Sequence, residues 1–161
     1  MWLGKVVFVG LWLWLLPSIA IRHQKVNPFS ARVIRITDGD TLEVLYGGKP
    51  LKIRLAYIDS PEKKRKQPYG DKAKNVLAVL CFNQKVKIYP QKHDRYKRLI
   101  AVLINDKGQN VNQEMIRLGM AWHYKKYSSD PIYAKLEIEA RKKHIGLWQD
   151  KNAIPPWYWR K

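Results

Sequence analysis

The chain has 161 residues, which is room for one ordinary domain and a short appendage, and 46% of them are hydrophobic, enough for a packed core. Lysine and arginine total 31 against 13 acidic residues, a net charge of +18. This excess favours a polyanionic partner: nucleic acid, an anionic membrane surface or an acidic polysaccharide. The single cysteine, Cys81, excludes an intramolecular disulfide and a Cys/His metal site. Its place in an apolar run predicts a buried side chain.

The first 20 residues form a separate hydrophobic segment in which Lys5 is the only charged side chain. The apolar run from Val6 to Ile21 is short for a membrane span, which needs about 20 residues. Small residues at Ser18 and Ala20 suit cleavage by a signal peptidase after Ala20. We expect residues 1–20 to be a cleaved signal peptide, with a membrane anchor as the alternative, and residues 21–30 to be a linker. The working domain is then extracytoplasmic: secreted or periplasmic, or anchored to the membrane and facing outward.

Alternating β-branched residues predict three strands in the first half of the domain, at 31–36, 41–46 and 51–58. Turn signals at Asp38-Gly39 and at residues 46–49 separate them. Ser60-Pro61 should end the third strand, because proline cannot continue a ladder. The basic stretch 63–68 is expected to form an exposed loop.

Beyond Gly70 the apolar spacing becomes helical, and further strands are predicted at 85–89 and 99–104. Helices are predicted at 111–118, ended by Gly119, and at 131–144, begun by Pro131. We expect residues 151–161 to form an extended, aromatic tail. The order of elements predicts an α+β fold: a five-stranded OB-fold β-barrel with about three helices over residues 31–150, preceded by the N-terminal hydrophobic segment.

Four of the thirteen acidic residues fall in two short clusters, Asp38-Gly39-Asp40 and Asp59-Ser60-Pro61-Glu62, each where a strand meets a turn. Carboxylates suit a hard metal ion or a general base, and the arginine fork of Arg54, on the strand before the second cluster, suits phosphate. On a straight strand Arg54 and Asp59 would point to opposite faces. The Ser60-Pro61 turn could bring Asp59 round to the side of Arg54. Turn capping by these acids is the alternative.

The sequence resembles the staphylococcal nuclease (thermonuclease) family. The resemblance is carried by Ile36-Thr37-Asp38-Gly39-Asp40-Thr41, by residues 53–62 (IRLAYIDSPE) and by Asp94-Arg95-Tyr96-Lys97-Arg98, with their spacings. It also covers Tyr69-Gly70, Val111-Asn112 with Gly119, and Gly146-Leu147-Trp148, and so spans about residues 31–150. Several ordered motifs over that length make a chance match improbable.

The resemblance implies a role for each matching residue. Asp40 and Asp59 would bind Ca²⁺ through their carboxylates and Ser60, where the family usually has threonine, through its main-chain carbonyl. Glu62 would be the general base or orient the attacking water, and Arg54 and Arg98 would clamp phosphate. Lys97 stands where the family usually has glycine, which puts the approach of Arg98 in question. Substrate contacts are expected from Tyr124 and Tyr127, with plain packing as the alternative, and from Lys63 and Lys64.

The resemblance thus implies a phosphodiesterase: a calcium-dependent, largely sequence-nonspecific endonuclease that hydrolyses DNA and RNA and leaves 3′-phosphates. Two alternatives are a catalytically weak OB-fold module that only binds nucleic acid and a membrane-anchored nucleic-acid receptor. Retention of Asp40, Arg54, Asp59, Glu62 and Arg98 argues against the first. We expect a monomer with nucleic acid as its partner, and contact with a membrane only if residues 1–20 are not cleaved.

Overall fold

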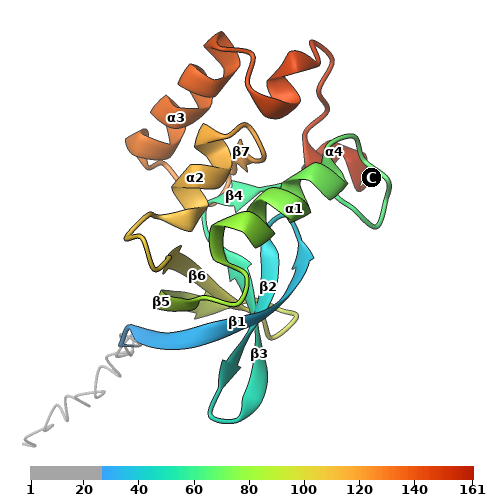
Figure 1. The fold of residues 1–161 in the computed structure, drawn as a ribbon. Helices are drawn as coiled ribbons and strands as arrows, with labels where there is room; N and C mark the ends of the chain where they lie inside the picture. Colours follow the sequence, from blue (N-terminus) through green and yellow to red (C-terminus); the bar gives the residue numbers. More distant parts are fainter. Residues whose placement is uncertain (1–26) are drawn as a thin grey trace, which may run out of the picture.

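The computed structural model describes residues 27–161, so the predicted signal or anchor and most of the predicted linker lie outside the described residues. Five strands close into a barrel in the order β1-β2-β3-β6-β5 (Figure 1). They are β1 (Phe29–Asp38), β2 (Thr41–Tyr46), β3 (Lys49–Leu55), β5 (Lys85–His93) and β6 (Leu99–Ile104). Neighbouring strands are antiparallel except β3 and β6, which run parallel. The expected five-stranded barrel is confirmed.

The barrel interior is filled by every second side chain of its strands. On β6, Leu99, Ala101 and Leu103 are buried while the residues between them are partly exposed. On β5, Val86 and Ile88 are buried, whereas Lys85 and Lys87 are exposed and Tyr89 is partly exposed. Because successive side chains on a strand point to opposite faces, this alternation fixes which face of each strand forms the core.

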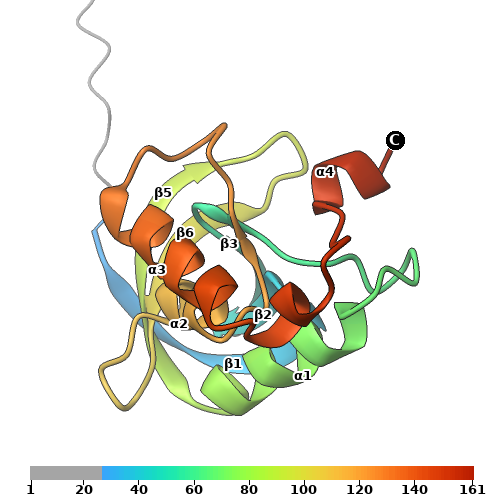
Figure 2. The same ribbon diagram turned by 90° about the horizontal axis from the view of Figure 1, so that it is seen from above.

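Three main helices cover the barrel: α1 (Gly70–Cys81), α2 (Val111–Arg117) and α3 (Pro131–Lys142). Figure 1 shows α2 and α3 stacked beyond one end of the barrel, and Figure 2 shows them over its mouth with α1 alongside. Leu77 of α1 and Met115 and Ile116 of α2 join the barrel interior in one core. Cys81 is fully buried, as expected, and burial raises the pKa of its thiol to about 12.

Three short elements were not predicted. The two-residue strands β4 (Ile58–Asp59) and β7 (Trp122–His123) pair with each other, and a 3-10 turn, η1, spans Gly146–Gln149. The tail, residues 151–161, is not extended as expected, because Pro156–Trp159 form the short helix α4. A proline at the first helical position is compatible with that start. Within residues 27–161, no helix is both long and apolar enough to cross a membrane.

Candidate active site

Arg54 joins the two acidic clusters at the end of β3. One of its terminal nitrogens lies 2.6 Å from Oδ1 of Asp40 and the other donates to Oδ1 of Asp59 at 2.7 Å. Asp40 reaches Arg54 because β2 and β3 are antiparallel and Thr41 pairs with Arg54 in register. Only 15% of the Arg54 side chain is exposed, so these charges interact with little solvent between them.

Asp59 reaches Arg54 because the chain turns earlier than expected. The third strand was predicted to run to Ile58, but β3 ends at Leu55 and the backbone turns at Tyr57, with φ of 70°. The alternation of a straight strand therefore does not apply to Asp59. The turn that matters is at Tyr57 and not at Ser60-Pro61.

The turn at Tyr57 is held from α2. The amide of the fully buried Asn112 donates to the carbonyl of Ala56 at 3.0 Å and to that of Ala101 at 3.1 Å. Its side-chain oxygen accepts the N–H of Leu103 at 3.1 Å. One side chain thus ties the helix to β6 and to the residue before the turn.

The Asp40 carboxylate has two hydrogen-bond partners besides Arg54. Its Oδ1 also accepts the hydroxyl of Thr41 at 2.9 Å, and its Oδ2 accepts the N–H of Ser60 at 3.1 Å. Burial alone would raise the pKa of Asp40, but the Arg54 guanidinium and these hydrogen bonds hold it below the usual range. Asp40 is therefore an ionised, fixed carboxylate.

Asp38 adds a further acid that the sequence reasoning left as a turn residue. Burial and the neighbouring charge of Asp40 raise the pKa of Asp38 to about 6. A β-carbon on Gly39 would lie 2.6 Å from the β-carbon of Ala73 and from Oγ of Ser60, so only glycine allows this close approach. Burial is the larger of these two causes, so Asp38 is an acid whose charged form is opposed mainly by desolvation.

Glu62 lies at the rim of the cluster and is held by Gln67. The N–H of Glu62 donates to Oε1 of Gln67 at 2.9 Å, and the N–H of Gln67 donates to the carbonyl of Glu62 at 3.1 Å. Gln67 is 5% exposed, although it belongs to the loop expected to be exposed. No sequence signal marked Gln67, because its role depends on the fold of the loop.

Arg160 is a second arginine on the same carboxylates, and the sequence reasoning missed it. Its terminal nitrogens donate to Oδ1 and Oδ2 of Asp59 at 3.1 and 2.6 Å and to Oε1 of Glu62 at 2.5 Å. It arrives from the tail, 101 residues beyond Asp59 in the sequence. No motif spacing links positions so far apart.

The carboxylates around Arg54 offer a hard divalent cation suitable ligands. Asp40 and Asp59 supply oxygen, and the hydroxyl of the buried Ser60 has no hydrogen-bond partner among the described residues. Residues 27–161 contain no group of three or more His, Cys, Asp or Glu side chains arranged to hold a metal. A cation here would therefore need main-chain and water oxygens as well, which Ca²⁺ accepts.

Arg98 is not brought into the cluster. Two of its nitrogens lie 2.7 Å from Oδ2 of Asp94, within the turn that precedes β6. Lys97 adopts a φ of 61° there, which explains why glycine suits this position. The turn nevertheless lies close along the sheet, because Ile100 pairs with Arg54.

Tyr124 and Tyr127 lie together, with ring centroids 4.8 Å apart, but Tyr124 is also covered by the tail. The ring of Trp157 stacks on Tyr124 with centroids 5.2 Å apart and planes at 4°. A pocket of about 610 Å³ adjoins this stack, and Lys125, Lys126 and Arg160 are among its lining residues. The pocket combines aromatic rings and positive charge.

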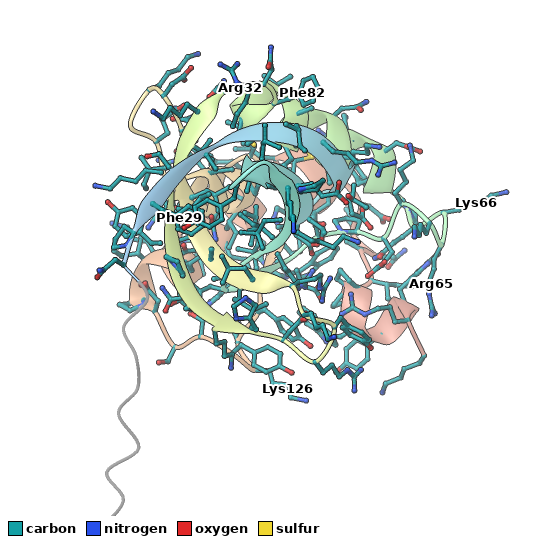
Figure 3. All side chains as sticks on the ribbon, turned by 90° about the horizontal axis from the view of Figure 1, so that it is seen from below. Phe29, Arg32, Arg65, Lys66, Phe82 and Lys126 are labelled. Carbon is teal, nitrogen blue, oxygen red and sulfur yellow. The ribbon has the colours of Figure 1, made fainter. Side chains whose placement is uncertain are left out.

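The basic loop, residues 63–68, lies beside the carboxylate cluster, where the N–H of Lys63 donates to Asp38. Lys63 and Lys64 are exposed, and Lys63 pairs with Asp71 of α1 at 2.6 Å. Figure 3 shows Arg65 and Lys66 on the outer edge of the loop, with Lys66 directed away from the body of the protein. The loop thus presents positive charge to solvent next to the carboxylate cluster.

Comparison with known proteins identifies the family. Residues 52–150 match the family described as Staphylococcal nuclease homologue. An uncharacterized endonuclease of Haemophilus influenzae is 47% identical over 133 residues, which cover 82% of this chain and 73% of that protein. The micrococcal nuclease of Shigella flexneri is 41% identical over 143 residues, covering 83% and 81%. An uncharacterized endonuclease of Escherichia coli is 43% identical over 129 residues, covering 80% and 83%. With its closed five-stranded barrel and its arginine–carboxylate cluster, the chain belongs to the staphylococcal nuclease family and is a nuclease.

Proposed function

We propose that the chain is a calcium-dependent endonuclease that hydrolyses phosphodiester bonds of DNA and RNA with little sequence preference and leaves 3′-phosphates. The observation that carries the proposal is the single guanidinium of Arg54 between Asp40 and Asp59, with Glu62 bound to the same cluster through Arg160. A phosphodiester is anionic and resists attack, so its cleavage needs positive charge beside a carboxylate that can accept a proton.

Each residue has a distinct task in this proposal. Glu62 accepts the proton of the attacking water, or orients that water, and its partial exposure leaves room for one. Arg54, held charged by Asp40 and Asp59, stabilises the developing charge on phosphorus-bound oxygens. Ca²⁺, when bound by Asp40, Asp59 and the Ser60 carbonyl, would neutralise phosphate charge. Arg98 would provide a second phosphate contact once it leaves Asp94.

The surroundings of the cluster fit a nucleic-acid substrate. Lys63, Lys64 and the pocket lysines would attract the phosphate backbone, and Tyr124 with Tyr127 would stack on a base. We further propose that the enzyme acts outside the cytoplasm as a monomer, with residues 1–20 as its export signal. N-terminal sequencing of protein from the culture medium would test the cleavage after Ala20.

The decisive assay compares cleavage of DNA and RNA by the full chain in Ca²⁺ and in chelator, with wild type beside Glu62→Gln. We expect cleavage in Ca²⁺, none in chelator, and a kcat about 10² to 10⁴-fold lower for Glu62→Gln, the usual range for a general base. Glu139→Gln on α3 makes the same charge change away from the cluster and should leave kcat unchanged.

Four outcomes would contradict parts of this proposal. Cleavage that persists in chelator would reject the metal, and full activity of Glu62→Gln would remove Glu62 from the mechanism. Binding without any cleavage would favour the non-catalytic binding module. End-group analysis showing 5′-phosphates would reject the assigned bond.

A further inference from the structure

We infer that the tail, residues 151–161, is an internal ligand that closes the active site and competes with the divalent cation and with nucleic acid. The inference rests on the proposed function, because it concerns the same carboxylates. It adds a closed and an open state of the site, with Arg160 as the residue that holds the closed state.

Arg160 already binds the carboxylates proposed to hold the cation and the attacking water. Asp59 is fully buried, and both of its oxygens accept hydrogen bonds from Arg160 while Oδ1 also accepts one from Arg54. Glu62 is engaged through Oε1. A metal ion chelated by both oxygens of Asp59, or a water bound at the lone pair of Glu62 Oε1 that Arg160 uses, would require Arg160 to move, since one lone pair cannot serve two partners.

The tail also covers the ring that is proposed to stack on a base. Trp157 lies parallel to Tyr124, and the ring of Trp122 packs edge-on against Trp157 with centroids 6.5 Å apart. The Trp157 ring therefore lies on the face of Tyr124 where a base is proposed to stack. The Arg160 guanidinium contacts the carboxylate of Asp59 where a cation is proposed to bind. These two contacts come from different residues and are independent observations.

Hydrogen bonds from the basic loop hold the tail in this position. Arg65 donates to the carbonyl of Arg160 at 2.8 Å, and the indole N–H of Trp159 donates to the carbonyl of Arg65 at 3.2 Å. Gln67, which holds Glu62, also donates to the carbonyl of Ile154 at 2.7 Å. Figure 1 shows α4 beside this loop, which connects β4 to α1. Opening the tail would thus free both the loop and Glu62.

The two states are linked by binding. A ligand that binds only the open state has its apparent affinity reduced by the fraction of molecules that are open. Removing Arg160 should therefore increase the affinity for Ca²⁺, whereas a residue that only helped catalysis would leave that affinity unchanged. Binding of Ca²⁺ should in turn release the tail, because linkage is reciprocal.

The test uses the full chain as wild type, Arg160→Ala and Lys161→Ala, with Ca²⁺ itself as the probe. Lys161→Ala is the matched control, because it removes the same charge from the adjacent, exposed position. Isothermal titration calorimetry should give a Kd for Ca²⁺ about tenfold lower in Arg160→Ala than in the control. A tenfold change is the lower end of the effect expected when a competing hydrogen bond between charged groups is removed. Hydrogen-exchange mass spectrometry should show faster exchange of peptide 154–161 in wild type when Ca²⁺ is added.

An equal or weaker affinity of Arg160→Ala for Ca²⁺ would overturn the inference. A second readout does not depend on metal: in chelator, peptide 154–161 should exchange faster in Arg160→Ala than in Lys161→Ala. Equal rates there would overturn the closed state even if the chain is a calcium enzyme. Faster exchange in Arg160→Ala with no Ca²⁺ binding in any variant would support the closed tail and contradict the proposed metal instead.

Discussion

At the scale of single residues, the position of Arg98 is set by its neighbour Asp94. Oδ1 of Asp94 accepts the N–H groups of Tyr96 and Arg98 at 2.8 and 2.9 Å and so closes the turn, while Oδ2 holds the Arg98 guanidinium. Partial burial opposes ionisation, but these hydrogen bonds and the charge of Arg98 lower the pKa of Asp94. The Asp94 carboxylate therefore both closes the turn and fixes the position of the Arg98 side chain.

Replacing Asp94 separates these two roles. Asp94→Asn keeps the acceptor that caps the turn but loses the charged partner of Arg98. We expect the free energy of unfolding at pH 7 to fall by about 0.5–1 kcal/mol, as for a partly exposed pair. Because the folded pKa lies below the unfolded value of about 3.9, the stabilisation is present above that pH and is lost as pH falls further. Urea unfolding at pH 7 and pH 2.5 measures this.

The control for that experiment is Asp150→Asn, in an exposed turn where the carboxylate accepts the N–H of Asn152 at 2.8 Å. It should change stability less at pH 7. A destabilisation by Asp94→Asn that is equally large at pH 2.5 would show that the ion pair with Arg98 is not its cause.

At the scale of elements, the site depends on how α2 seats on the sheet. The side-chain amide of Asn112 donates to the carbonyls of Ala56 and Ala101, and its oxygen accepts the N–H of Leu103. These backbone groups lie where β3 and β6 pair in parallel. The residue after Ala56 is Tyr57, whose left-handed backbone aims Asp59 at Arg54. A contact made by a helix thus decides where a carboxylate of the site points.

Asn112→Leu should lower the free energy of unfolding by about 3 kcal/mol. It keeps a similar volume but leaves the buried N–H of Leu103 and the carbonyl of Ala56 without these partners, at about 1–3 kcal/mol for each unsatisfied group. Gln113→Leu on the same helix is the control and should change stability by less than about 1 kcal/mol. Urea unfolding compares them, and equal effects would contradict the role of Asn112.

At the scale of the whole molecule, the net charge of +18 dominates the approach of a polyanion. The lysines are not equivalent, however. Lys125 and Lys126 line the pocket beside the tail, whereas Lys49 lies at the start of β3, in the hairpin at the far end of the barrel in Figure 1. Figure 3 shows Lys126 projecting from the edge of the molecule. Position should therefore decide which charges contact phosphates.

Salt dependence of DNA binding tests that distinction. The affinity of Glu62→Gln for a DNA duplex in chelator should fall steeply with salt, and Lys126→Ala should reduce the magnitude of the log–log slope by about 1, the effect of one phosphate contact. Lys49→Ala removes the same charge and should leave the slope unchanged. Fluorescence anisotropy at several salt concentrations gives the slopes, and equal slopes for the two variants would refute a localised interface.

The sequence by itself determined the barrel strands and the main helices, and it marked the candidate site residues. β2 and β6 lie at the predicted bounds, because alternation and flanking turn residues are local signals. Asp40, Arg54, Asp59 and Glu62 could be singled out since each lies in a short motif. The two-residue strands β4 and β7 could not be predicted, because a pairing that short leaves no periodic pattern.

Only the tertiary structure decided how the candidate site is assembled and which arginine of the tail contacts it. The turn at Tyr57, the hold of Asn112 on Ala56 and the buried position of Gln67 depend on contacts between separate elements. Arg160 reaches Asp59 across 101 residues, and such a contact depends on the path of the whole chain and not on a local pattern. The acids that the sequence marks as a cation site are therefore paired, in the folded protein, with an arginine that the sequence does not mark.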